Sequence, residues 1–171
     1  MKKALYIWTA VLLSVGALAP AAIAGNLVTF DGGIGVIPVS AGPAANVVRG
    51  VSPGGQPWVI SKLKARVKDN GNITVQGEGL LLAGGNGIGT GGSGNSATAI
   101  NLSVFATLIC ETAAPFTQLN TTLTGVQLDD NGDFRIDDVL TPAPPADCAK
   151  PVLLIRNAGN LAWFAAGIPK N

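Results

Sequence analysis

The chain contains no histidine and few charged side chains. Of its 171 residues none is histidine, and only 12% are Asp, Glu, Lys or Arg. Without imidazole a protein cannot form a Ser-His-Asp or Cys-His catalytic arrangement, a His-ligated zinc, copper or haem site, or a histidine general base. The low charge and the 23 glycines argue against a disordered tail and a coiled coil. Most hydrolase and redox chemistry is therefore excluded, and the length allows one ordinary domain or two small ones.

The first 24 residues have the layout of a secretory signal peptide. Lys2 and Lys3 form a basic start of bacterial type, an apolar run extends from Ala4 to Ala19, and Ala22-Ile23-Ala24 is a small-residue cleavage site. A membrane anchor is the alternative, but the run is shorter than the ~20 residues of a spanning helix. We therefore expect a signal peptide over residues 1–24 and a single secreted domain over residues 25–171, in the periplasm or outside the cell.

Cleavage would change the charge balance and hence the expected partners. The full chain carries 11 Lys and Arg against 10 Asp and Glu, and loss of Lys2 and Lys3 leaves nine basic against ten acidic side chains. A nearly neutral chain has no general attraction to nucleic acid or to anionic membranes. No later stretch is apolar for long enough to span a bilayer. The expected partner is an envelope polymer or a protein, with no specific nucleic acid.

Cys110 and Cys148 are the only two cysteines, and both lie in the part that would be exported. An even pair in an oxidising compartment predicts one disulfide. A redox pair or a shared metal is the alternative, but the Cys-x-x-Cys spacing is missing. The disulfide would close a loop of about 39 residues and contribute ~4 kcal/mol through the entropy of the unfolded chain.

Alternation of apolar and polar residues predicts strands. Lys62, Lys64, Arg66 and Lys68 share one face of a strand, and the opposite face carries Val59, Ser61, Leu63, Ala65 and Val67. Asp69-Asn70-Gly71 predicts a hairpin turn that leads into a return strand with Ile73, Val75 and Gly77 facing inward. Leu128–Ile136 repeats the pattern around Asn131-Gly132, which predicts a second, equivalent hairpin.

The rest of the chain predicts further short strands and no helix beyond the signal. The longest strand is expected from Ala97 to Glu111, and others are expected at 27–30, 35–39, 80–83, 152–156 and 162–168. Short strands with frequent Gly, Pro and Asn-Gly turns are typical of an all-β fold. We predict a single-domain antiparallel β-sandwich of Greek-key or immunoglobulin-like type, with a barrel as the alternative.

Two segments could carry a binding function but have ordinary explanations. Gly84–Asn95 is a glycine-rich loop that formally matches the dinucleotide-binding G-x-G-x-x-G pattern at Gly87–Gly92. That chemistry needs a helix after the glycines, whereas a strand is expected here, so a surface connection is the better interpretation. Asp129, Asn131 and Asp133 match the first three ligands of a helix-loop-helix calcium site, but Phe134 stands where glycine is required. A looser calcium site on this turn and a solvated hairpin turn both remain open.

The stripe Lys62, Lys64, Arg66 and Lys68 places cations at ~6.7 Å intervals along one strand face. It could bind an anionic glycan, a lipid headgroup or a nucleic-acid backbone, or it could simply prevent edge-to-edge pairing of strands. Trp58 and Trp163 could stack on sugar rings, although core packing is favoured for both. This stripe is the first candidate for a binding face.

Catalysis has little support in the sequence. Glu78 and Glu111 are the only glutamates, and nothing in the sequence brings them together as a glycosidase pair. We assign no catalytic residue and no cofactor, apart from the calcium that the acidic turn could take.

Four stretches together resemble a family of proteins. They are Gly79–Thr90, Asn131–Ile136, Pro151–Asn157 and Trp163–Gly167. Taken together they resemble a group of secreted bacterial β-proteins that have a cysteine ahead of a Pro-Val-Leu strand and no established activity. The resemblance supports an all-β fold and implies no function.

Three hypotheses of function follow from the sequence. The first is a non-enzymatic exported β-sandwich with a structural, envelope-associated or adhesive role. The second is a binding module that holds an anionic glycan or another polymer on the basic strand face. The third is an enzyme that uses carboxylates or a bound metal, and it has the least support.

Overall fold

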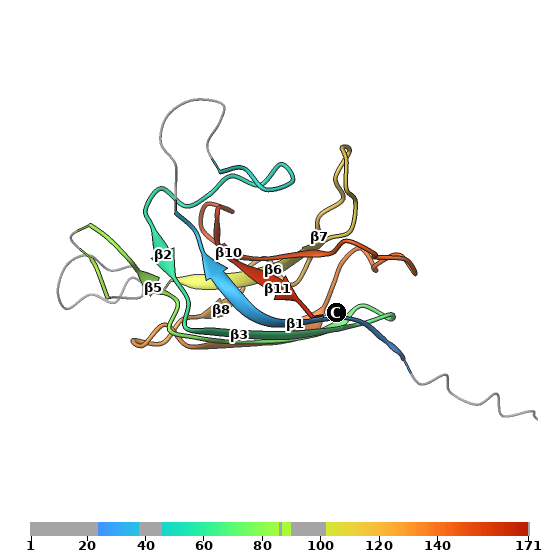
Figure 1. Ribbon diagram of the computed structural model, residues 1–171. Helices are drawn as coiled ribbons and strands as arrows, with labels where there is room; N and C mark the ends of the chain where they lie inside the picture. Colours follow the sequence, from blue (N-terminus) through green and yellow to red (C-terminus); the bar gives the residue numbers. More distant parts are fainter. Residues whose placement is uncertain (1–23, 38–45, 86, 90–101, 171) are drawn as a thin grey trace, which may run out of the picture.

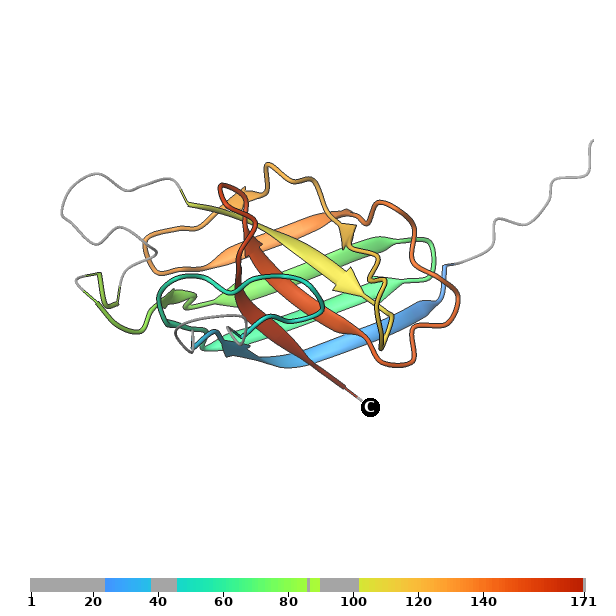
Figure 2. The ribbon, with the colours of Figure 1, turned by 90° about the horizontal axis from the view of Figure 1, so that it is seen from above.

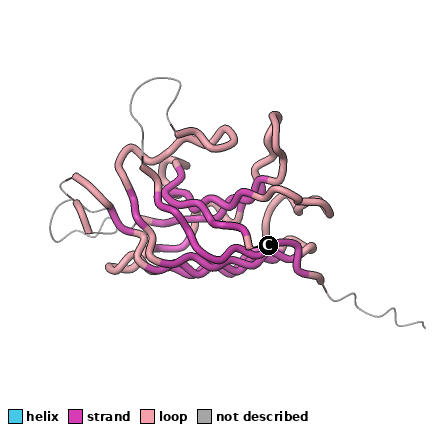
Figure 3. Tube along the Cα trace, viewed as in Figure 1, coloured by secondary structure: helices cyan, strands magenta, loops and turns pink. Residues whose placement is uncertain are grey.

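The structure consists of strands and the loops that join them. The computed structural model describes residues 24–37, 46–85, 87–89 and 102–170, and within these ranges it contains 11 strands and no helix (Figures 1 and 3). All pairs of these strands are antiparallel. The strands are β1 (Asn26–Gly35), β2 (Trp58–Val59), β3 (Lys62–Lys68), β4 (Asn72–Glu78), β5 (Leu81–Leu82), β6 (Ser103–Ile109), β7 (Leu119–Asn120), β8 (Val126–Gln127), β9 (Phe134–Val139), β10 (Val152–Asn157) and β11 (Trp163–Pro169). The predicted all-β fold is confirmed.

One long sheet folds over to make two layers. Its strand order is β7-β6-β10-β11-β1-β3-β4-β9, with β8 on β6 and a separate β2–β5 pair. β3, β4 and β9 form one layer, and β6, β10 and β11 cross it obliquely in the other (Figures 1 and 2). The two ends of the sheet meet where Asn120 and Thr141 exchange backbone hydrogen bonds of 3.0 and 2.8 Å. The fold is therefore a sandwich whose sheet is nearly closed into a barrel.

β1 is the strand that joins the two layers (Figure 1). Its first part pairs with β3, as in Thr29 with Arg66, and its second part pairs with β11, as in Ile34 with Ala166. Between the pairs at Phe30 and Gly33 the register shifts, because β1 has one more residue than β11. This is a β-bulge, and Gly32 within it has a φ of 105°, a conformation that favours glycine.

The apolar faces of the two layers form the core between them. On β3 the alternation is as predicted, with Leu63, Ala65 and Val67 buried and the cations between them exposed. The expected face ends at Leu63, because Val59 is 49% exposed and Ser61 is exposed too. The largest fully buried side chains include Phe30, Leu63, Ile73, Leu80, Leu108, Leu153, Leu154 and Ile155.

The predicted hairpins are confirmed in one case and corrected in the other. β3 and β4 form the first hairpin, with six paired positions and Gly71 at a φ of 87°. The second turn has the same geometry, with Gly132 at a φ of 76°. However, the strands on either side of this turn do not pair with each other. β8, which precedes the turn, pairs with β6, and β9, which follows it, pairs with β4. The turn itself packs on Leu80, whose amide donates to the Gly132 carbonyl at 2.9 Å, so the repeat extends to the turn and not to its strands.

Two predicted strand boundaries also change. The strand expected at 27–30 is part of the longer strand β1, because the bulge at Gly32 keeps the chain paired as far as Gly35. Of the strand expected at 35–39 only Gly35 belongs to β1; Val36 and Ile37 lie outside any strand, and residues 38 and 39 lie outside the described ranges. The long strand from Ala97 is described only as β6, since 97–101 lie outside those ranges as well. The signal peptide is likewise outside, apart from Ala24, so the boundary at residue 24 stays a prediction.

The predicted disulfide is present. Cys110 at the end of β6 is bonded to Cys148 in the connection before β10, with the two Cα atoms 4.9 Å apart. Beside it, Arg49 donates to the carbonyls of Ile109 and Lys150 at 2.7 and 2.8 Å. These bonds hold the ends of β6 and of the 140–151 connection together.

A buried arginine organises the outside of the second layer. Arg156 on β10 is 5% exposed and lies over the Phe105 ring, with 5.1 Å between Cζ and the ring centroid. It donates to the Leu161 carbonyl at 2.8 Å, to Gln118 Oε1 at 2.7 Å and to Thr107 Oγ1 at 3.2 Å. Because these acceptors come from both sides of β10, the guanidinium ties the flanking loops to the sheet.

Replacing Gly32 tests the importance of the bulge. Gly32→Ala should lower the free energy of unfolding by about 1–3 kcal/mol, because a residue with a Cβ is strained at this φ. Gly55→Ala is the matched control, since an added Cβ there has open space. Urea denaturation of both variants measures the difference, and equal midpoints would contradict the role given to the bulge.

Removing the disulfide tests its contribution to stability. The double variant Cys110→Ala/Cys148→Ala should unfold with a free energy lower by ~4 kcal/mol, because 38 residues of sequence separation are no longer closed into a loop. A reducing agent should lower the denaturation midpoint of the wild type to that of the double variant and leave the midpoint of the double variant unchanged. An unchanged wild-type midpoint under reduction would show that the bond adds no stability.

Candidate functional site

The outer face of β1, β3, β4 and β9 carries most of the exposed polar side chains that sequence analysis selected. Strand register places Asp31, Lys64, Gln76 and Arg135 side by side in one row across the four strands. The neighbouring row consists of Thr29, Arg66, Thr74 and Asp137. The face is therefore a grid of alternating polar and charged groups, and the predicted basic stripe is one column of it.

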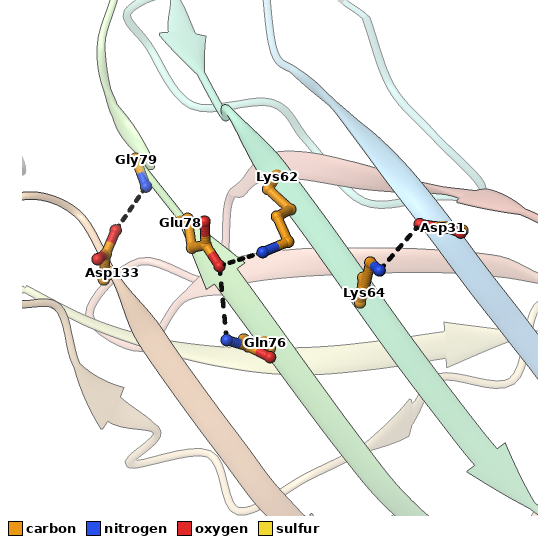
Figure 4. Close-up of polar contacts among 7 residues, drawn as sticks. All are labelled: Asp31, Lys62, Lys64, Gln76, Glu78, Gly79 and Asp133. Atoms are coloured by element: carbon orange, nitrogen blue, oxygen red, sulfur yellow. Dashed lines mark hydrogen bonds and ion pairs between the residues drawn. The ribbon is translucent and has the colours of Figure 1, made fainter.

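Ion pairs neutralise part of the stripe (Figure 4). Lys62 Nζ lies 2.6 Å from Glu78 Oε1, and Lys64 Nζ lies 4.0 Å from Asp31 Oδ1. Lys170, which follows β11, approaches the other oxygen of Asp31 at 3.6 Å. The side chains of Arg66 and Lys68 have no hydrogen bond or ion pair with any residue that the structure describes. The four cations of the stripe therefore differ in how far their charge is compensated, and Arg66 and Lys68 have the least compensation.

A shallow hollow lies over the middle of this face. Its volume is about 360 Å³, and its charged rim consists of Asp31, Lys64, Arg66, Arg135 and Lys170. The polar side chains between the charges are Thr29, Thr74 and Gln76. Phe30 and Ala65 contribute to the floor, but their side chains are buried in the core. We call this site the outer hollow; it holds four cations and one carboxylate.

The outer hollow contains two cations that sequence analysis missed. Arg135 is the one basic residue on β9, and Lys170 lies near the C-terminal end of the sequence. Both enter the site only through pairing of strands that are far apart in the chain: β9 pairs with β4, and β11 pairs with β1. No local pattern around either residue could have shown this.

The acidic turn uses its carboxylates as backbone acceptors. Asp129 Oδ1 accepts from the amides of Asn131 and Asp133 at 2.9 and 2.8 Å. Asp133 Oδ1 accepts from the Gly79 amide at 2.8 Å (Figure 4). Over the described ranges no group of three or more His, Cys, Asp or Glu side chains is arranged to hold a metal ion. The geometry assigns these oxygens a role in the turn, and calcium binding there stays an untested prediction.

Asp138, close behind that turn, holds the two ends of the sheet together. Its Oδ2 accepts from the Thr122 amide at 2.8 Å, and Oδ1 accepts from the Val139 amide at 2.7 Å. The hydrogen bond from the Thr122 amide is the main cause that lowers the pKa of Asp138. Since Thr122 follows β7 and Asp138 lies on β9, this carboxylate reinforces the neighbouring Asn120–Thr141 bridge.

Trp58 and Trp163 are core residues. Trp58 is 5% exposed and stacks on Phe164 with 4.1 Å between the ring centroids. Trp163 is 3% exposed, and its Nε1 donates to the Asn46 carbonyl at 3.0 Å. Neither ring offers a free face to a sugar, so the suggestion that they bind glycans by stacking is wrong and the core-packing interpretation is confirmed.

The two glutamates have separate roles. Glu78 is bound to Lys62 on the outer face of β4. Glu111 follows β6 next to the disulfide, where hydrogen bonds, chiefly that from the Thr117 side chain, lower its pKa.

The glycine-rich loop is described in part, at Gly84, Gly85 and 87–89. The Gly89 amide donates to the Leu82 carbonyl at 2.8 Å, and Asn86 and 90–95 lie outside the described ranges.

Comparison with known proteins returned no relative. No family model matches the sequence, and no curated protein or solved structure matches it either. The resemblance to secreted bacterial β-proteins therefore stays a prediction. Within the residues described, no helix is long and apolar enough to cross a membrane.

Acid titration tests the role of Asp138. Because its pKa is lowered in the fold, its ionised form stabilises the protein above the unfolded-state pKa of about 3.9, and this contribution is lost as the pH falls through the lower folded-state value. Asp138→Asn should lower stability at neutral pH and weaken the pH dependence of stability below about pH 4. Urea midpoints measured from neutral to acidic pH give both profiles.

Asp137→Asn is the control for this prediction, since the Asp137 side chain is 73% exposed and lies 3.8 Å from Arg135. Its profile should match that of the wild type. If Asp138→Asn also follows the wild-type profile, the hydrogen bond to Thr122 does not couple this carboxylate to folding.

Proposed function

We propose that the protein is a non-enzymatic, exported β-sandwich that binds an anionic polymer of the cell envelope through its outer hollow. The observation that carries the proposal is the excess of cations in the hollow, where Lys64, Arg66, Arg135 and Lys170 face a single carboxylate, Asp31. An open, positively charged surface on a nearly neutral chain attracts anions locally rather than over the whole molecule.

Export is supported by the layout of the first 24 residues and by the disulfide. Disulfides persist mainly in oxidising compartments such as the periplasm and the extracellular medium. The fold is also rigid, since the disulfide, the nearly closed sheet and the Asp138 carboxylate all restrain the ends of strands. A rigid fold suits a role at the envelope.

A non-enzymatic role is supported by the engagement of the acidic residues. The carboxylates of Asp129, Asp133 and Asp138 accept hydrogen bonds from backbone amides, and Glu78 is bound to Lys62. These groups hold turns and strands in place. Because these carboxylates are engaged and the sequence has no histidine, catalysis by carboxylates or a bound metal has the least support among the three hypotheses.

A purely structural role is the second candidate. It is favoured by the cross-strand pairs Lys62–Glu78 and Lys64–Asp31, which use cations of the stripe to join neighbouring strands. Under this hypothesis the stripe is a solvated face that discourages edge pairing, and the protein contacts the envelope through another surface.

Binding to an immobilised carboxylate polymer separates the two candidates. Wild-type protein should bind polygalacturonate at low salt and elute as the salt rises, because exposed charges are screened. Arg66→Gln should weaken binding about fivefold, as loss of one exposed charge contact costs about 1 kcal/mol. Lys150→Gln is the control, since it removes the same charge from an exposed position outside the outer hollow.

Thermal melts followed by circular dichroism would show that both variants are folded. Absence of wild-type binding at low salt would contradict the proposal. So would binding by Arg66→Gln as tight as that of the wild type, and either result would favour the structural role.

A further inference from the structure

The cations of the outer hollow are arranged across the strands as well as along β3. Lys64 and Arg135 lie in the same row with Gln76 between them, so their backbones are two strand spacings, about 10 Å, apart. Lys170, whose amide donates to the Thr29 carbonyl, brings its ammonium to 3.6 Å from Asp31 at the other end of this row. The stripe along β3, in contrast, leads from the hollow to Lys62, which is outside it.

The cations inside the hollow are those with spare charge. Lys64 and Lys170 share the single carboxylate of Asp31, at 4.0 and 3.6 Å. Arg135 is 3.8 Å from Asp137, but both side chains are more than half exposed, which makes this a weak pair. The Arg66 side chain has no polar partner among the residues described. Lys62, with Glu78 at 2.6 Å, has the closest compensation on this face (Figure 4).

Neutral hydrogen-bonding groups lie between the charged side chains of the two rows. Thr74 lies between Arg66 and Asp137, and Gln76 lies between Lys64 and Arg135. Thr29 is directly opposite Arg66 on β1. Hydroxyl and amide groups at these positions can both donate to and accept from the hydroxyls of a sugar. A polyphosphate chain or a lipid headgroup has few hydroxyls to use them.

We infer that the outer hollow recognises an acidic polysaccharide lying across the strands, along the row from Lys170 to Arg135. Lys64, Arg66, Arg135 and Lys170 bind its carboxylates, and Thr74 and Gln76 bind its hydroxyls. This inference rests on the proposed function and specifies the ligand class and the direction of binding. It makes Arg135 and Lys170 binding residues and leaves Lys62 outside the site.

Titration with an oligogalacturonate octasaccharide at low salt tests the direction of binding. Arg135→Gln and Lys170→Gln should each weaken binding about fivefold. Lys62→Gln should bind like the wild type, although it removes the same charge from the same face. If Lys62→Gln loses as much affinity as Arg135→Gln, the ligand follows the stripe or responds to charge in general, and the inference is wrong while the proposed function stands.

The ligand class is tested with other polyanions at the same salt concentration. Single-stranded DNA, polyphosphate and phosphatidylglycerol vesicles should bind more weakly than the octasaccharide, and Thr74→Val should weaken only the octasaccharide. Equal or tighter binding of any of the three would overturn the polysaccharide assignment. Failure of the wild type to bind any polyanion would overturn the proposed function together with the inference.

Discussion

One extra residue in β1 determines both the sheet and the face that it presents. The bulge at Gly32 lets β1 pair first with β3 and then with β11, so a single strand belongs to both layers. Because the two pairings overlap at Phe30, the end of β11 lies on one side of β1 and β3 lies on the other. Asp31 then contacts Lys64 from one pairing and Lys170 from the other. Lys170 reaches the outer hollow because this strand turns the corner between the layers.

The opposite end of the sheet is held by different means. Asn120 and Thr141 exchange two backbone hydrogen bonds, and Asp138 caps the Thr122 amide next to them. The Cys110–Cys148 bond restrains the connection that follows β9. Asp138, like Asp129 and Asp133 in the acidic turn, accepts hydrogen bonds from backbone amides, which must be satisfied wherever a sheet nearly closes without a continuous ladder.

Local patterns predicted the parts of the fold that local chemistry determines. The β3–β4 hairpin follows from alternation around an Asn-Gly turn, and the disulfide follows from an even pair of cysteines in a chain expected to be exported. The same turn signal misled at Leu128, since β8 finds its partner in β6, a strand some twenty residues earlier. The stripe was visible because its members alternate along one strand. Arg135 and Lys170 were not, because register between distant strands brings them to the hollow.

The central proposal is that the corner in β1 brings Lys170 to a cationic hollow, and that this hollow binds an acidic polysaccharide. Nuclear magnetic resonance of isotopically labelled protein, titrated with an oligogalacturonate, tests it residue by residue. The account predicts that the largest amide shifts fall at Asp31, Lys64, Gln76 and Arg135, in the row that crosses the four strands. Shifts confined to another surface, such as the turn at Gly87–Gly89, or no shifts at all, would contradict it.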